Sequence, residues 1–242
     1  MPKIDDKLNN ELLSQQTLLV ISPHPDDAVI GCGGLMAKIK SLGGKVYVLT
    51  ITVGDEPQYG SFSKMHIRES EEKKAMNYLK ADGYEIALKG DKFHLKLDTV
   101  PQKDIIDLIE KKSECSIENV KPTIVAIPSL SSENQDHIAV SKAAFTALRP
   151  RPSNLKHFPD IVISYEQGST FWSIDLFKPD FFVDVSDFLS VKLTALSYYK
   201  TQIPKSGFSP RTIESIEILA KLRGTQICTK AAEAFESLRI KF

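Results

Sequence analysis

The sequence predicts an α/β fold, a Rossmann-like, doubly wound and mostly parallel sheet with helices on both faces. Short apolar and β-branched runs alternate along the chain with segments whose apolar residues recur at helical spacing, which is typical of repeated strand–helix units. Loop residues separate these segments, and we find no internal repeat and no low-complexity linker. The 242 residues are enough to bury one sizeable core, so we expect a single α/β domain over residues 1–242.

The expected elements follow one another in order from residue 17. The run Thr17–Ser22 predicts the first strand, and apolar residues from Val29 to Ile39 predict a helix that Gly43 and Gly44 end. Right-handed crossovers between such units place the strands parallel to one another. Further strands are expected at residues 45–52, 84–88, 123–128 and 160–164, and further helices at 63–80, around 105–109 and at 138–148.

The loop after the first strand carries the most reactive side chains. It reads Pro23-His24-Pro25-Asp26-Asp27. His24 and Asp27 lie three residues apart and offer an imidazole and a carboxylate to a metal, while Asp26 leaves a second carboxylate for proton transfer. The ordinary alternative is that Asp26 or Asp27 caps the helix that follows. The loop by itself leaves both interpretations open.

A second polar loop, residues 129–137, follows the strand expected at 123–128 and ends in His137. In doubly wound sheets, ligands bind outside the carboxyl ends of the strands, where the strand order reverses. We expect this reversal between the strands that precede the two loops, so that the loops face each other across one crevice. His24, Asp27 and His137 then form a set of two histidines and one carboxylate, which suits catalytic zinc and also accepts iron or another divalent metal.

Composition and charge disfavour other classes of function. Lysine plus arginine equals aspartate plus glutamate at 31 residues each, so no basic field attracts nucleic acid. A Rossmann-type nucleotide binder is disfavoured because Gly31-Cys32-Gly33-Gly34 lacks the third glycine and carboxylates crowd the place of a pyrophosphate. Residues 1–16 are polar and unlike a signal peptide, and no apolar run approaches the roughly 18 residues of a membrane span. We therefore expect a cytoplasmic protein without a membrane span.

Several motifs carry a family resemblance over nearly the whole chain. The loop 23–27 with its following glycines, the Arg68-x-x-Glu71 helix and the Asp136-His137 loop resemble the PIG-L / LmbE-like de-N-acetylases. The segments 182–202, 223–224 and 232–235 are similar to that family's C-terminal elements. The resemblance implies an LmbE-like fold and a zinc-dependent N-deacetylase, a hydrolase that acts on small amino-sugar substrates such as N-acetylglucosaminyl conjugates. Because family members often assemble, it also leaves a homo-oligomer open.

The resemblance further implies a role for each matched residue. His24, Asp27 and His137 would bind Zn²⁺, Asp26 would be the general base and Arg68 would contact the substrate. Asp136 would orient a histidine beside the metal. This agrees with the chemistry of the residues, since a metal-activated water needs a carboxylate that takes its proton. From its position alone, Tyr165 lies at the end of an expected strand, at the right edge to reach the substrate.

The chain departs from the family's pattern at two positions. Ala28 stands where the family commonly has glutamate, which removes a carboxylate but no metal ligand. Asn134 stands where the family usually has the histidine that helps to stabilise the oxyanion, and asparagine offers only a neutral hydrogen bond. His66 could supply the missing cation, although a solvent-facing helix residue is the more ordinary interpretation. Two alternatives therefore stay open: an amidase for a non-sugar N-acyl substrate, and a non-catalytic metal- or carbohydrate-binding relative.

Overall fold

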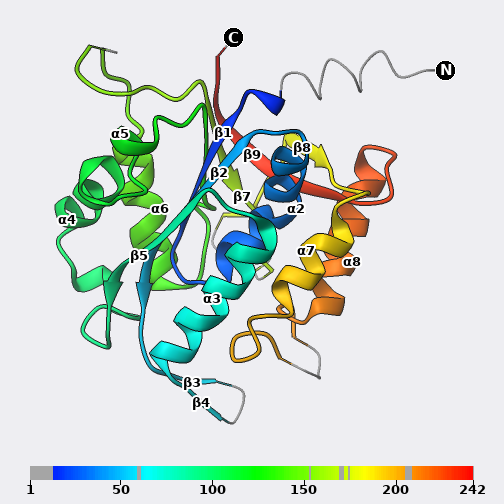
Figure 1. The fold of residues 1–242 in the computed structure, drawn as a ribbon, viewed down its shortest axis with the longest axis horizontal. Helices are drawn as coiled ribbons and strands as arrows, with labels where there is room; N and C mark the ends of the chain where they lie inside the picture. The colour runs from blue at the N-terminus through cyan, green and yellow to red at the C-terminus, as the bar shows by residue number, and fades with distance from the viewer. Residues whose placement is uncertain are drawn as a thin grey trace.

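The computed structural model describes residues 13–58, 61–152, 154–168, 172–173, 175–204 and 209–241. A seven-stranded sheet forms its centre (Figure 1). In spatial order its strands are β5 (Gly83–Lys89), β2 (Lys45–Val53), β1 (Thr17–Ser22), β6 (Ile124–Pro128), β7 (Ile161–Tyr165), β9 (Ala232–Ile240) and β8 (Phe181–Asp184). The first five of these pair in parallel, and β9 pairs antiparallel with β7 and β8. The predicted mostly parallel α/β sheet is confirmed.

Helices connect the strands at nearly the expected positions. A short hairpin of β3 (Glu56–Gln58) and β4 (Ser61–Ser63) lies outside the central sheet and was not predicted. The strand β9 and the helix before it were not predicted either. The helices are α2 (Asp27–Ser41), α3 (Met65–Leu79), η1 (Leu97–Thr99), α4 (Gln102–Asp107), η2 (Leu108–Lys112), α5 (Ile117–Val120), α6 (Gln135–Ala147), α7 (Leu189–Leu196) and α8 (Ile213–Gln226).

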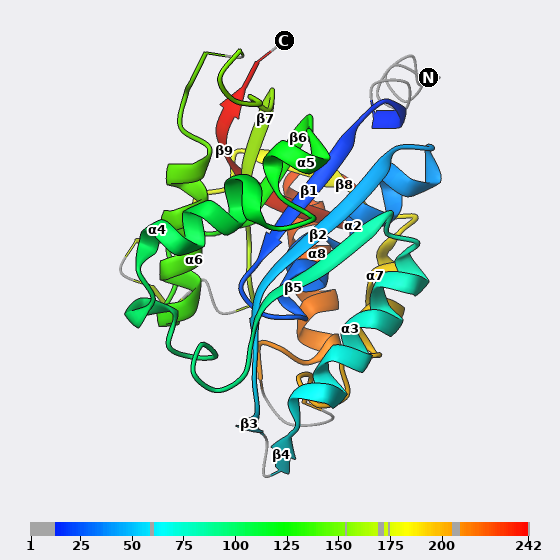
Figure 2. The ribbon, with the colours of Figure 1, turned by 60° about the vertical axis from the view of Figure 1, so that its left-hand side comes forward.

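The sheet buries both of its faces, as β1 illustrates. Leu18 and Val20 belong to one buried cluster, and Leu19 and Ile21 belong to the other, because successive side chains of a strand point to opposite faces. The helices α2, α3, α7 and α8 cover the first face, and α4 and α6 cover the second (Figure 2). Because helices cover both faces of the sheet, a central strand carries apolar residues at successive positions.

The strand order reverses between β1 and β6. The chain runs outward from β1 through β2 to β5, and then returns to place β6 on the other side of β1. The loop 23–26 follows β1, and the loop 129–134 follows β6. Both loops therefore open at the carboxyl ends of neighbouring strands, where such sheets bind ligands.

No helix within the described parts of the chain is long and apolar enough to cross a membrane. Most of the N-terminal segment that bears on the expected location, residues 1–12, lies outside the described residues. The cytoplasmic location, the single-domain organisation and a homo-oligomer stay predictions.

Candidate metal centre and active site

Three side chains from the two loops converge on one point. Asp27 Oδ2 lies 3.3 Å from His24 Nδ1 and 3.1 Å from His137 Nε2, and these two nitrogens lie 3.2 Å apart. A tetrahedral metal with bonds of about 2.0–2.1 Å separates its ligand atoms by about 3.3 Å, so the three donors fit one such ion. All three side chains are buried. The structure thus brings together the three residues expected to bind a metal.

Hydrogen bonds at the end of β1 fix the first loop. Ser22 Oγ contacts the His24 carbonyl oxygen at 2.5 Å and accepts a hydrogen bond from the Ala28 N–H at 3.1 Å. The His24 N–H in turn donates to Asp27 Oδ2 at 3.1 Å. Asp26 occupies the N-cap position of α2, but its side chain makes no capping hydrogen bond to any described residue. The Asp26 carboxylate is therefore not explained as a helix cap.

The second ring nitrogen of each candidate ligand histidine also has a partner. His24 Nε2 lies 3.1 Å from Asp136 Oδ2, and His137 Nδ1 lies 2.5 Å from Gln167 Oε1. Asp136 is itself fixed, because its two oxygens accept hydrogen bonds from the N–H groups of Leu95 and Leu97 at 2.8 Å. Partners of this kind set the tautomer and ring orientation of a ligand histidine. The sequence suggested this role for Asp136 but not for Gln167.

The charges of His24, Asp27 and His137, the buried trio, and of Asp136 beside them stabilise one another. Burial lowers the pKa of His24, but hydrogen bonds to Asp136 and Asp27 outweigh burial and raise this pKa to about 9. Burial raises the pKa of Asp27, yet the neighbouring His137 and His24 hold that pKa well below its ordinary value. A bound cation would therefore take the place of the proton that His24 holds.

Asp26 lies next to the trio and is completely buried. Its Oδ2 forms an ion pair with Arg211 Nη2, a contact that the sequence gave no reason to expect. Its Oδ1 is buried and has no hydrogen-bond partner among the residues that the structure describes. Unpartnered buried acceptors are rare and require an explanation. A water molecule or substrate group that donates to Oδ1 would provide one.

Arg68 sits behind the centre rather than on an open surface. Its side chain is buried, and Nη1 contacts the Gly54 carbonyl oxygen at 3.0 Å, Glu56 Oε2 at 3.0 Å and His94 Nε2 at 2.7 Å. The His94 ring packs edge-on against His24, with ring centroids 5.0 Å apart. The buried His94 thus lies between Arg68 and the candidate metal centre.

Two other predicted site residues have structural partners. Tyr165 is fully buried, and its hydroxyl donates to the Ile21 carbonyl oxygen at 3.0 Å. In this structure the ring packs against Gly31 of α2, and the expectation that Tyr165 contacts substrate stays a prediction. Asn134 is the N-cap of α6, and its Oδ1 accepts from the Asp136 N–H at 2.9 Å and the His137 N–H at 3.4 Å. The exposed His66 has the solvent-facing position of the ordinary interpretation.

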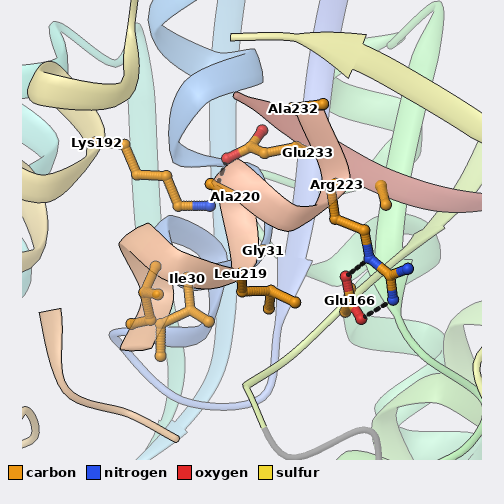
Figure 3. A pocket seen from close by; sticks show the side chains of 11 residues that line it. Ile30, Gly31, Glu166, Lys192, Leu219, Ala220, Arg223, Ala232 and Glu233 are labelled. Atoms are coloured by element: carbon orange, nitrogen blue, oxygen red, sulfur yellow. Dashed lines mark hydrogen bonds and ion pairs between the residues drawn. The ribbon is translucent and has the colours of Figure 1, made fainter. Parts of the chain in front are cut away.

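Two ion pairs join the C-terminal elements to one another and to the segment after β7 (Figure 3). Arg223 of α8 contacts Glu166 through Nε at 2.8 Å and Nη2 at 2.5 Å. Lys192 Nζ lies 2.7 Å from Glu233 Oε1. Because Glu166 directly precedes Gln167, the Arg223 pair fixes the segment that positions the partner of His137. Arg223 and Glu233, which belong to the C-terminal motifs, therefore position other residues.

Comparison with known proteins assigns the family. Residues 19–148 match the PIG-L family, described as GlcNAc-PI de-N-acetylase. The chain belongs to the PIG-L family. This PIG-L protein is 27% identical over 214 residues to a diacetylchitobiose deacetylase of Thermococcus kodakarensis, which covers 85% of the chain and 77% of the relative. It is 28% identical over 209 residues to the uncharacterized deacetylase YaiS of Escherichia coli, covering 82% of the chain and 100% of that protein.

Solved structures share the fold of this PIG-L protein. The crystal structure of the conserved protein TT1542 from Thermus thermophilus superposes with a TM-score of 0.71 at 24% sequence identity. The superposition covers 94% of this chain and 97% of the other. The predicted LmbE-like architecture and the family resemblance are confirmed.

Proposed function

We propose that this PIG-L protein is a zinc-dependent N-deacetylase that removes the acetyl group from an N-acetylated amino sugar or its glycoside or conjugate. One observation carries the proposal. Asp26 lies beside the buried trio and holds Oδ1 without a hydrogen-bond partner in the described part of the chain. An unpartnered buried acceptor costs free energy, which is expected where the atom serves a reaction. Family membership supports the same reaction class.

In the proposed mechanism His24, Asp27 and His137 hold the metal, and Asp26 moves the proton. A divalent metal at such a site lowers the pKa of water to about 7 and polarises a carbonyl group. Asp26 accepts the proton that the water loses as its oxygen adds to the amide carbon. It then returns this proton to the amine nitrogen as the C–N bond breaks. Asp136 keeps His24 in the tautomer that leaves Nδ1 available to the metal.

The names of the family and of one relative support an amino-sugar substrate. The family description and the Thermococcus relative both name sugars that carry N-acetyl groups. Arg68 is proposed as a substrate-binding residue because its buried Nε has no partner within the described residues and is available as a donor. Zinc is proposed as the metal because His24, Asp27 and His137 offer a ligand set that suits it, although this set also accepts other divalent ions.

A non-catalytic metal- or carbohydrate-binding protein is the second candidate. Asn134 stands where the family usually has histidine, and its Oδ1 is used in the cap of α6. The remaining NH₂ group is a neutral donor, and loss of a strong oxyanion donor costs about 10²–10³ in rate. This candidate predicts stoichiometric metal without turnover. An amidase for a non-sugar N-acyl substrate predicts turnover only outside the amino sugars.

Metal content and acetate release test the proposal together. We expect about one zinc per chain, and acetate release from at least one member of a panel of N-acetylglucosamine conjugates. Asp26→Asn should abolish release and keep the metal, because Asp26 contributes no atom to the trio. Asp98→Asn is the matched control, since Asp98 is an exposed carboxylate. Absence of metal, or full activity of Asp26→Asn, would contradict the proposed chemistry.

A further inference from the structure

A cation is missing from the place where the family carries one. Asn134 offers a neutral NH₂ group, and its oxygen caps α6. His66 is exposed on α3. Arg68 is 1% exposed, and Nη1 is already bonded to Gly54, Glu56 and His94. Asn134 and His66 therefore offer no positive charge beside Asp26, and Arg68, whose charge interacts with Asp26, spends Nη1 on the residues behind the centre.

Arg211 has the position and exposure that the others lack. Its Nη2 contacts Asp26 Oδ2 and lies 3.8 Å from Asp27 Oδ1. Its side chain is 28% exposed, whereas the side chains of Asp26 and Asp27 are 1% and 2% exposed. Arg211 is therefore partly exposed to solvent while it contacts the two buried carboxylates.

The backbone around Arg211 is fixed, which allows the side chain to be aimed. The Arg211 N–H donates to Ser209 Oγ at 3.3 Å, and Ser215 Oγ donates to the Ser209 carbonyl oxygen at 2.8 Å. Thr212 caps α8, because its Oγ1 accepts from the Ser215 N–H at 3.1 Å. Arg211 thus projects from the anchored start of a helix rather than from a free loop.

We propose that Arg211 is the oxyanion-stabilising residue of this site and replaces the histidine that the family carries at position 134. The inference rests on the proposed deacetylase function. In the first step the water oxygen bonds to the amide carbon, its proton passes to Asp26, and the carbonyl π pair moves onto the carbonyl oxygen. Asp26, the partner of Arg211, thereby loses its negative charge, and a negative charge develops on the former carbonyl oxygen of the amide.

This transfer of charge makes Arg211 selective for the transition state. In the resting site its charge is balanced by Asp26. Once Asp26 is protonated, Arg211 can donate to the oxyanion instead, so its stabilisation grows as the reaction advances. When the C–N bond breaks, Asp26 gives its proton to the amine nitrogen and becomes available to Arg211 again. The cycle is balanced in atoms and charge.

Kinetics of Arg211 variants test the inference. We expect Arg211→Ala to lower kcat about 10²–10³-fold while KM stays within about threefold, because the lost contact forms in the transition state. Arg211→Lys should retain part of the rate. Asn134→His should restore at least about tenfold in the Arg211→Ala background and have a smaller effect in the wild type, which a double-mutant cycle would show. A methylphosphonate analogue of the tetrahedral intermediate should bind Arg211→Ala about 10²-fold more weakly.

Controls separate this inference from the proposed function. Arg151→Ala removes an exposed arginine elsewhere and should leave kcat unchanged. Equal metal content and thermal midpoint would show that the Arg211 variants are folded. A rise in KM with unchanged kcat would overturn the oxyanion role in favour of ground-state binding of an anionic group, and unchanged or higher kcat would overturn it outright. No acetate release by the wild type would overturn both proposals, whereas release that Arg211→Ala matches overturns this inference alone.

Discussion

Replacement of Asp136 by asparagine should weaken metal binding by a calculable amount. The completely buried Asp136 carboxylate meets three donors: Oδ1 accepts from the Leu97 N–H, and Oδ2 accepts from the Leu95 N–H and contacts His24 Nε2. Asparagine has one oxygen for these three partners. Whichever way the amide turns, its NH₂ group faces at least one donor, so the variant loses a hydrogen bond in either orientation.

The magnitude follows from the better of the two orientations. With its oxygen toward His24 and Leu95, the amide keeps the histidine bond but leaves the buried Leu97 N–H unpaired, at a cost of about 1–3 kcal/mol in the free energy of unfolding. The acceptor for His24 is then neutral. Removal of such a partner of a ligand histidine costs about 10–100-fold in metal affinity. We expect a zinc Kd near the lower end, about tenfold weaker, which corresponds to about 1.4 kcal/mol.

Competition with a fluorescent zinc chelator measures this change directly, on protein first stripped of metal. Asp98→Asn provides the control for the loss of one negative charge, and denaturant titration measures stability in parallel. An Asp136→Asn variant whose zinc Kd stays within twofold of wild type would refute the argument that Asp136 orients His24. So would a loss as large in Asp98→Asn, because a general charge effect would then explain both.

Three further predictions concern stability. Burial raises the pKa of Glu72 to about 8, so the folded protein loses the Glu72 proton as pH rises through that value. The free energy of unfolding should therefore fall by up to about 1.4 kcal/mol per pH unit between about pH 5 and 8. Denaturant titrations should show a smaller fall for Glu72→Gln. Gly31→Ala would place a Cβ 2.2 Å from Tyr165 Cδ2, and calorimetry should show a lower thermal midpoint, for a cost of about 1–3 kcal/mol. Asn134→Ala should lose about 1 kcal/mol of cap energy in denaturant titrations, and Asn134→Asp should not.

The sequence predicted the parallel half of the sheet because its signals are local. A buried strand such as β1 is a continuous apolar run, and the loop behind it is recognisable in adjacent residues. The strand β9 carries Glu233, Glu236 and Arg239 among its nine residues, so it lacks such a run. Its antiparallel place between β7 and β8 results from tertiary pairing, which no short window of sequence displays.

The site divides in the same way. His24, Asp27 and His137 could be proposed together because two loops at neighbouring strand ends must meet. Gln167 and Arg211 could not, since each lies in a segment without characteristic spacing and reaches its partner from a distant part of the chain. The contacts of Tyr165 could not be predicted either, because a strand end gives the position of a side chain but not its direction, and the Tyr165 hydroxyl donates to the Ile21 carbonyl oxygen.

Metal binding and turnover should therefore be separable in this protein. Asp136 and Gln167 contact the ligand histidines. Backbone N–H groups hold Asp136, and the ion pair of Arg223 with Glu166 holds the segment that carries Gln167. Within the described residues, neither Asp136 nor Gln167 forms a hydrogen bond to Asp26. Arg211 contacts Asp26 and lies 3.8 Å from Asp27 Oδ1, whereas the two histidines contact the other oxygen of Asp27, Oδ2. Substitutions at Asp136 or Gln167 should lower zinc affinity and have a smaller effect on kcat at saturating zinc. Substitutions at Arg211 should lower kcat at unchanged zinc affinity, because the oxyanion that Arg211 is proposed to stabilise exists only during the reaction.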